Sequence, residues 1–375
     1  MIPYGKQCIS KDDIEAVVSV LDSDFLTTGP MVGEFEKQLA EFSEVEYAVA
    51  VSNGTAALHC AVFAAGIQAG DEVIVSAMTF AASANCVVYM GGIPVFADSL
   101  ADSLLIDPED VRRKMTRKTK AVIAVDYAGQ PCDYKALRQI CSEHGLVLIT
   151  DACHSIGSEF QGQKTGSIAD ITCYSFHPVK HITTGEGGAA VTNNIEYAEK
   201  MRVFRNHGIT TDFRQRENKG AHFYEMSFLG YNYRLTDFQS ALGISQLKKL
   251  PGWLRRRNEI ADLYFKKFNN DSRVQPLQVK RDLFHSYHLF VVRLSDFFDR
   301  DVIFKKMRDA GIGVNVHYIP VHLHPFYRDK FATSEGLCPV AEDAYKRILS
   351  LPMFPGLKDS EVDFVSETLY SFLDK

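Results

Sequence analysis

YSFHPVKHITTGEGGAAVTN, residues 174–193, places a lysine between two short apolar segments. The flanking runs Ile171–Phe176 and Ala189–Thr192 are typical of buried strands, and the residues between them contain a proline, two threonines and three glycines. Lys180 is therefore expected on a loop, where a lysine is usually a solvated surface residue. A lysine that is partly desolvated loses its proton more easily, and its free amine is then a nucleophile toward an aldehyde. The stretch predicts a lysine that can form a Schiff base.

The bulk properties limit the class of protein. The chain has 375 residues, of which 46% are hydrophobic, and its net charge of -6 gives no overall basic field for nucleic acid. It has no apolar run long enough to span a bilayer and no apolar segment near its start that is typical of a signal peptide. Eight cysteines without a C-x-x-C pair indicate free thiols in a reducing compartment. We expect a cytoplasmic protein with no nucleic-acid or membrane partner.

The fold is predicted to be α/β. Seven short apolar runs have the character of strands that are buried on both faces, as in a mostly parallel sheet covered by helices on both sides. These runs are Ala48–Val51, Glu72–Ser76, Pro94–Ala97, Ala121–Val125, Leu146–Thr150, Ile171–Phe176 and Ala189–Thr192. We place a domain boundary near Leu250, so that residues 1–250 form the N-terminal lead and a large domain and residues 251–375 form a smaller α+β domain.

Other segments are assigned from their periodicity, caps and breakers. The predicted helices are Lys11–Leu21 with Ser10 as N-cap, Glu34–Glu44, Ala56–Ala65, Thr236–Leu250 ended by Pro251, Trp253–Phe268, Asp301–Ala310 and Ser360–Leu373. Asp24–Gly33 is predicted as a loop, and His288–Leu294 and Gly313–Tyr318 as strands of the smaller domain.

Four features together describe a site for pyridoxal 5′-phosphate. Gly54 and Thr55 follow a strand and open a helix, whose free N–H groups suit a phosphate, although the same sequence is also a common helix cap. Asp151 ends a buried strand, where its carboxylate would keep a pyridine nitrogen protonated, unless it only caps the next turn. Phe80 can stack on a flat ring or simply belong to the core. With Lys180 as the Schiff-base residue, the set matches this cofactor.

Several longer segments make the resemblance specific. SNGTAALH, MTFAASAN, TDACHSIGSE, CYSFHPVKHITTGEGG, GYNYRLTDFQSALGISQL, NVHYIPVH and SLPMFPGL resemble, in order and spacing, the DegT/DnrJ/EryC1/StrS family of sugar aminotransferases over nearly the whole chain. Within it, SFHPVKHITTGEGG and VDYAGQPCD are most similar to the branch that acts in pseudaminic acid biosynthesis. The resemblance implies fold type I of the PLP-dependent transferases and a homodimer with shared active sites.

The resemblance also implies roles for individual residues. The implied catalytic residues are Lys180, Asp151 and His154. The implied cofactor contacts are Gly54, Thr55, Ala56, Phe80, Asp151, His154, Ser175 and Lys180, with Asn232 reaching the phosphate in the other subunit. The implied substrate contacts are Tyr4, Asp24, Phe25, Leu26, Thr27, Ala56, His177, Asn232, Arg234, His317, Tyr318, Ile319 and Pro320. Ala56 departs from the pattern, because relatives in this branch can carry serine there.

The implied reaction moves an amino group, with glutamate as donor, to C4 of a UDP-linked 4-keto-6-deoxy-N-acetylhexosamine. Three alternatives remain open: another nucleotide keto-sugar, such as the D-gluco 4-keto isomer or a 3-keto sugar; a sugar dehydratase, against which Lys180 argues; and a regulatory protein that binds the cofactor without turnover. A metal site at His317, His322 and His324 is disfavoured, because these histidines lie on a proline-containing loop with no acidic residue nearby.

Overall fold

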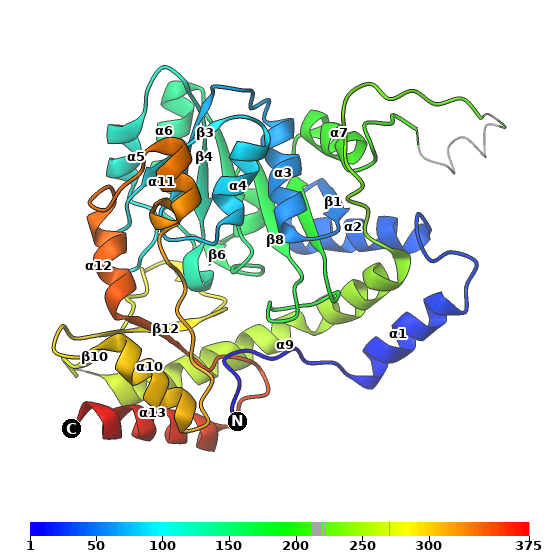
Figure 1. Ribbon diagram of the computed structural model, residues 1–375. Helices are drawn as coiled ribbons and strands as arrows, with labels where there is room; N and C mark the ends of the chain where they lie inside the picture. Colours follow the sequence, from blue (N-terminus) through cyan, green and yellow to red (C-terminus); the bar gives the residue numbers. More distant parts are fainter. Residues whose placement is uncertain (212–219, 221, 270, 375) are drawn as a thin grey trace.

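A computed structural model describes residues 1–211, 220, 222–269 and 271–374. Its centre is a seven-stranded sheet in the order β1-β9-β8-β5-β4-β2-β3 (Figure 1). All neighbouring pairs are parallel except those made by β9, which runs antiparallel to β1 and β8. The strands are β1 Tyr47–Val51, β2 Glu72–Ser76, β3 Ile93–Ala97, β4 Thr119–Val125, β5 Val147–Asp151, β8 Ile171–Ser175 and β9 Gly188–Thr192. The predicted α/β fold and its mostly parallel sheet are confirmed.

Helices cover both faces of this sheet. Along β1, Val49 and Val51 belong to one buried apolar cluster, whereas Ala48 and Ala50 belong to another. Because successive side chains of a strand point to opposite faces, each face has its own core. The helices of this part are α1 Lys11–Leu21, α2 Pro30–Ser43, α3 Gly54–Ala64, α4 Ala82–Tyr89, α5 Pro108–Lys114, α6 Tyr134–His144, α7 Ile195–Phe204 and α9 Asp237–Phe268.

Helix α9 corrects one prediction. It continues through Pro251 for 32 residues, where we expected one helix to end and another to begin. A proline inside a helix removes one backbone hydrogen bond, but the ring of Pro251 lies on the exposed side of the helix, away from its packed face. Packing against α1 and α2 on one part and against α13 (Asp359–Leu373) on another holds the helix continuous. The division into domains near Leu250 stays a prediction.

Two further boundaries differ from the sequence prediction. Helix α2 begins at Pro30 rather than at Glu34, because the carboxylate of Asp237 accepts hydrogen bonds from the N–H groups of Gly29 (2.6 Å) and Met31 (2.9 Å) at its N-terminus. The predicted strand Gly313–Tyr318 is wrong. That segment makes only an isolated bridge, between Asn315 and Ser350, and runs as extended chain beside the N-terminal lead.

The C-terminal part has its own apolar cluster, built around a three-stranded antiparallel sheet in the order β10-β12-β13. Its elements are β10 Val274–Pro276, β12 Phe290–Leu294, β13 Ile348–Leu351, α10 Arg300–Asp309, α11 Pro325–Phe331, α12 Pro339–Arg347 and α13 Asp359–Leu373. Three short strands, β6 Glu159–Phe160, β7 Gln163–Lys164 and β11 Leu283–Phe284, form a small separate sheet. Among the described helices, none is long and apolar enough to cross a membrane.

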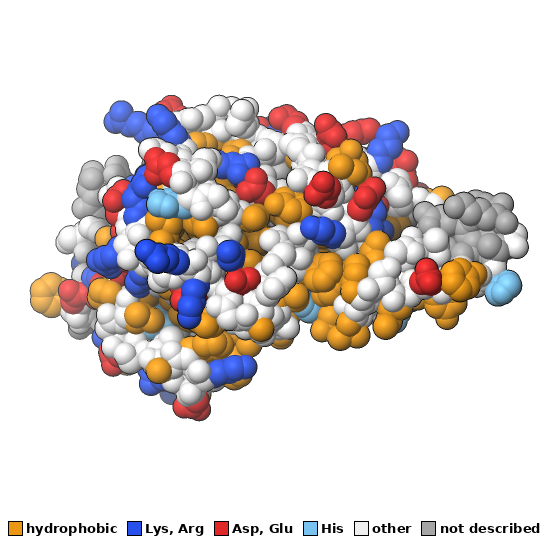
Figure 2. Space-filling model, turned by 90° about the horizontal axis from the view of Figure 1, so that it is seen from above, with side chains coloured by type: hydrophobic (Ala, Val, Ile, Leu, Met, Phe, Trp, Pro, Cys, Tyr) orange, Lys and Arg blue, Asp and Glu red, His pale blue; other side chains and the backbone are white. Residues whose placement is uncertain are grey.

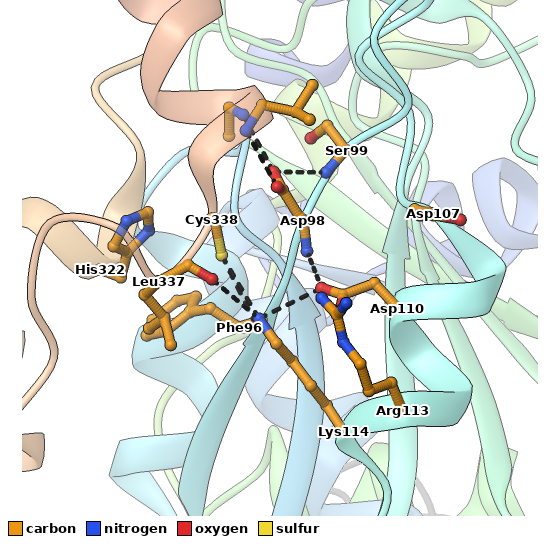
Figure 3. Close-up of polar contacts among 12 residues, drawn as sticks. Phe96, Asp98, Ser99, Asp107, Asp110, Arg113, Lys114, His322, Leu337 and Cys338 are labelled. Atoms are coloured by element: carbon orange, nitrogen blue, oxygen red, sulfur yellow. Dashed lines mark hydrogen bonds and ion pairs between the residues drawn. The ribbon is translucent and has the colours of Figure 1, made fainter.

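A polar cluster ties the C-terminal part back to the central sheet (Figure 3). The carboxylate of Asp98, just after β3, accepts hydrogen bonds from the N–H groups of Val340 (3.0 Å) and Ala341 (2.9 Å) at the start of α12. Lys114 donates to the carbonyls of Phe96 (2.6 Å) and Leu337 (3.2 Å). The preceding chain is attached next to β2 by contacts of its own, from the N–H of Tyr318 to Sδ of Met78 (3.3 Å) and from the N–H of Val321 to the carbonyl of Ala77 (3.1 Å).

Candidate active site

A cavity of about 430 Å³ lies where β5 and β8 end and α3 begins. This is the carboxyl edge of the parallel strands, the usual ligand position in open α/β sheets. The cavity brings together eleven of the site residues predicted from the sequence. They are Tyr4, Gly54, Thr55, Phe80, Asp151, His154, Ser175, His177, Lys180, His317 and Tyr318.

Lys180 lies on the loop between β8 and β9, as predicted. Its backbone N–H donates to the carbonyl of His177 (2.8 Å), and its side chain lines the cavity. Burial lowers the pKa of its ammonium group, while the nearby Cys153 and Asp151 act in the opposite direction. Within the described ranges, Nζ of Lys180 has no hydrogen-bond partner. The amine is therefore placed to react with an aldehyde that enters the cavity.

Asp151 ends β5 and is 6% exposed. Its Oδ2 accepts a hydrogen bond from Oγ of Ser83 (2.6 Å), and its Oδ1 accepts one from the N–H of Cys153 (3.2 Å). Oγ of Ser83 also lies 2.7 Å from Oγ1 of Thr79. A buried carboxylate held in this way suits a cationic partner such as a protonated pyridine nitrogen. Ser83, which lies in the same MTFAASAN segment as Phe80, was not among the site residues predicted from the sequence.

The start of α3 forms a close-fitting seat. Asn53 is the N-cap, and its side-chain oxygen accepts from the N–H of Ala56 (2.8 Å). A Cβ atom on Gly54 would lie 2.9 Å from Cβ of Ser175 and 3.2 Å from Sγ of Cys153, so a larger residue does not fit without movement. In the described part of the chain, the N–H groups of Gly54 and Thr55 have no partner. They are free for an anion at the positive end of the helix.

Aromatic side chains form the walls of the cavity. Phe80 is 60% exposed, and its ring centroid lies 6.0 Å from that of Tyr318. The hydroxyl of Tyr318 is 3.0 Å from Nε2 of His154. Burial lowers the pKa of His154, and Lys180 acts in the same direction, so the imidazole is neutral. Phe80 and His154 thus line the same cavity as Asp151 and Lys180.

The remaining predicted residues do not line this cavity. Ala56 is buried and its N–H is used in the helix cap. Residues 24–27 and Asn232 are exposed on this chain. Arg234 donates to Asn206 (2.9 Å) and lines a second hollow of about 360 Å³ together with Arg202 and Arg205. Ile319 and Pro320 follow Tyr318 outside the cavity lining. Their predicted roles, like those of the residues inside the cavity, stay predictions.

Several cavity residues were not predicted from the sequence. They are Asn53, Thr79, Cys153, Glu186, His288 and Asn315. Asn53 and Cys153 adjoin the predicted residues Gly54 and His154 in the chain, and this proximity could have indicated that both line the cavity. His288 comes from a distant segment, and its sequence context, SYHLFVV, reads only as the start of a strand.

The residues present fit pyridoxal 5′-phosphate. The free N–H groups of Gly54 and Thr55 suit its phosphate, the buried carboxylate of Asp151 suits its ring nitrogen, and Lys180 suits its aldehyde. The sheet and this constellation define a PLP-dependent aminotransferase of fold type I. The chain belongs to the DegT/DnrJ/EryC1/StrS aminotransferase family, and the match spans residues 7–370. It is a PLP-dependent sugar aminotransferase.

Individual relatives are similar to this chain over nearly the full length of both chains. The spore coat polysaccharide biosynthesis protein SpsC of Bacillus subtilis is 39% identical over 373 residues, which are 98% of this chain and 96% of that protein. The structure is similar to that of the putative sugar aminotransferase Spr1654 from Streptococcus pneumoniae in its PMP form, with a TM-score of 0.95 and 32% identity over 100% of this chain and 99% of the other. It is also similar to Helicobacter pylori PseC, an aminotransferase involved in the biosynthesis of pseudoaminic acid, with a TM-score of 0.93 and 33% identity over 100% and 99% of the two chains.

Proposed function

We propose that this enzyme transfers an amino group from glutamate to C4 of a UDP-linked 4-keto-6-deoxy-N-acetylhexosamine, UDP-4-keto-6-deoxy-β-L-AltNAc, in pseudaminic acid biosynthesis. The observation that carries the amino-transfer part is the partly desolvated amine of Lys180 in one cavity with the buried carboxylate of Asp151. The similarity to PseC supports the choice of sugar. The segment SFHPVKHITTGEGG with His177, which resembles the pseudaminic acid branch, supports it as well.

Each residue has a separate task in this proposal. Pyridoxal 5′-phosphate, when bound, supplies an aldehyde carbon for amines and a ring that accepts electrons. Asp151 keeps the ring nitrogen protonated. Because its pKa is lowered, the amine of Lys180 can accept a proton from Cα of the amino acid and later deliver one to C4 of the sugar. Gly54 and Thr55 hold the phosphate through their N–H groups, and Phe80 excludes water from one face of the ring.

The charge of the cavity argues for a second subunit at each site. The cavity must hold a cofactor phosphate and, in turn, a donor dicarboxylate and a sugar diphosphate. Among the described residues that line it, Lys180 is the only lysine or arginine. Buried anions need paired charges or hydrogen-bond donors. We infer that Asn232 and Arg234 of one subunit supply some of these charges and hydrogen-bond donors to the site of the other subunit, in a homodimer with two-fold symmetry.

The surface of the chain supports such a dimer. Phe223, Met226 and Leu229, which precede Asn232 in the chain, are 67%, 62% and 74% exposed. Figure 2 shows hydrophobic side chains gathered on the right of the view, on one face of the molecule. Apolar groups that are exposed together in this way are typical of a protein interface.

Mixing two inactive variants tests the shared site. Refolding Lys180→Ala chains together with Asn232→Ala chains gives heterodimers in which one site carries both changes and the other carries neither. We expect activity to return on mixing, provided that each variant is inactive alone. Heterodimers without activity would refute the shared site. Asn232 would then act in the site of its own chain or in no site.

The substrate is tested by direct assay. The holoenzyme is incubated with glutamate and either UDP-4-keto-6-deoxy-β-L-AltNAc or the D-gluco 4-keto isomer, and the amino sugar is identified by NMR. We expect the first ketone to be the preferred substrate, with Lys180→Ala as the inactive control. Preference for the other isomer or for a 3-keto sugar would overturn the choice of sugar. A bound cofactor whose absorption does not change with any amino donor would instead indicate a regulatory binding protein.

A cytoplasmic location is part of the same proposal. All eight cysteines of the structure are free thiols, and six of them are buried. Thiols persist in this form in a reducing compartment.

A further inference from the structure

Three buried imidazoles lie in a row beside Lys180, and we call them the histidine row. His154 is in the turn after β5, His181 follows Lys180 in the chain, and His288 comes shortly before β12. The ring centroids of His154 and His288 are 4.3 Å apart, and those of His288 and His181 are 5.5 Å apart. His154, His181 and His288 are 5%, 3% and 4% exposed, respectively. The row joins three segments that are distant in sequence at one wall of the site.

Hydrogen bonds fix the two ends of the row but not its middle. Nε2 of His181 lies 3.1 Å from the carbonyl of Ser286, which can only accept, so this nitrogen carries the proton. Nε2 of His154 meets the hydroxyl of Tyr318 at 3.0 Å. Nδ1 of each of the three rings is buried and, in the described part of the chain, has no partner. The ring of His288 makes no hydrogen bond to any described residue, so ring packing alone holds it.

The surrounding charges keep the row neutral. Burial is the main cause that lowers the pKa of all three imidazoles. Lys180 acts on each of them in the same direction, and the buried Arg257, which donates to the carbonyl of Tyr287 (2.9 Å), acts on His181 and His288. A protonated ring here would stand next to the ammonium group of Lys180. His288 is therefore a neutral, flat spacer between His154 and His181.

We propose that His288 is a positioning residue for amino transfer: its ring packs against His154 and holds that imidazole where Nε2 meets Tyr318, at the wall of the cofactor pocket. The proposal rests on the proposed function only through the place of His154 beside the cofactor ring. His288 acts through the shape of its ring, since its nitrogens have no described partner. A phenyl ring at this position should then replace it, whereas a side chain without a ring should not.

The test compares His288→Ala with His288→Phe. In the apoprotein, long-range ¹H–¹⁵N spectra of the imidazoles report the tautomer of His154. We expect one fixed tautomer in the wild type and in His288→Phe, and averaged signals in His288→Ala. In the holoenzyme, kcat of His288→Ala should fall on the order of 10- to 100-fold, as for a displaced active-site group, with the KM for the keto-sugar unchanged. His288→Phe should retain most of kcat.

His285 supplies the matched control. It is a buried histidine of the same segment, stacked on Tyr287 with ring centroids 3.8 Å apart, and it does not line the cavity. His285→Ala should leave the His154 signals and kcat unchanged. If His288→Ala does not fold, His288→Leu, which fills space without a flat ring, takes its place.

Either of two results would contradict the positioning role of His288. Unchanged His154 signals in His288→Ala, or a His288→Phe variant as impaired as His288→Ala, would overturn the positioning role. Absence of aminotransferase activity in the wild type would refute the proposed function instead, and the apoprotein spectra would still decide the role of His288.

Discussion

Gly54 is the tightest point of the proposed phosphate seat, and Gly54→Ala tests that seat directly. The added Cβ would lie 2.9 Å from Cβ of Ser175 and 3.2 Å from Sγ of Cys153, both close to the backbone and unable to turn far away. The start of α3 must therefore move, and overpacking of this kind costs roughly 1–3 kcal/mol of folding stability. The N–H groups of Gly54 and Thr55 would shift together with the backbone.

The size of the effect on cofactor binding follows from those N–H groups. A hydrogen bond to a charged group contributes about 1.5–3 kcal/mol. Loss of one such bond to the phosphate would raise the Kd of pyridoxal 5′-phosphate roughly 10- to 150-fold, at about 1.4 kcal/mol for each factor of ten. The assay is a titration of apoprotein with the cofactor, followed by absorption, together with thermal unfolding of the apoprotein.

Gly33 supplies the control, because it lies inside α2 and a Cβ added there has no atom within 4 Å. Gly33→Ala should leave the Kd unchanged and stabilise the fold by up to about 1 kcal/mol, the difference in helix propensity. If Gly54→Ala binds the cofactor as tightly as the wild type, the phosphate does not bind at the start of α3 and the proposed orientation of the cofactor is wrong.

Three more predictions follow from the same geometry. Asp151→Asn keeps the shape of the residue but removes its charge, so turnover should fall far more than cofactor occupancy; equal losses in assay and absorption would indicate a structural carboxylate. Ser83→Ala removes the 2.6 Å hydrogen bond to Asp151, and kcat/KM should fall by up to roughly 100-fold, since such a bond contributes about 1.5–3 kcal/mol; unchanged kinetics would show that Ser83 does not support the site. Burial lowers the pKa of His285 to about 3. As the pH falls below about 6.5, His285 is therefore protonated in the unfolded chain but not in the folded one, and the free energy of unfolding decreases. In urea denaturation of the apoprotein, the loss of stability between pH 7 and pH 5 should be smaller by about 2 kcal/mol in His285→Gln, and an equal loss in both proteins would contradict the burial of a neutral ring.

The sheet was predictable because its signal is local. Strands such as β2 and β5 are short apolar runs bounded by polar residues, and burial on both faces makes that pattern unbroken. The start of α2 was not predictable in this way. Its cap is Asp237, more than 200 positions away from Gly29, and no local pattern reports such a partner. The continuity of α9 through Pro251 likewise depends on tertiary packing.

The same distinction between local patterns and distant contacts applies to the site. Asp151, Gly54 and Lys180 follow the ends of strands, so the topology of a parallel sheet brings them to one edge, and the sequence alone indicated their meeting. Ser83 contacts Asp151 and His288 contacts His154 from segments whose own patterns are ordinary for a helix and a strand. Their importance lies in which atoms they meet, at 2.6 Å from Asp151 for Ser83 and in ring contact with His154 for His288, and only the folded chain contains that information.

The central claim is that Lys180 carries the cofactor as a Schiff base. Reduction of the holoenzyme with sodium borohydride fixes such a bond permanently, and peptide mapping by mass spectrometry then locates the pyridoxyl group. We expect the label on the peptide that contains Lys180, and we expect pretreatment with glutamate, which converts the cofactor to its amine form, to prevent labelling. A label on another lysine, or no label in a protein that contains the cofactor, would contradict this account of the site.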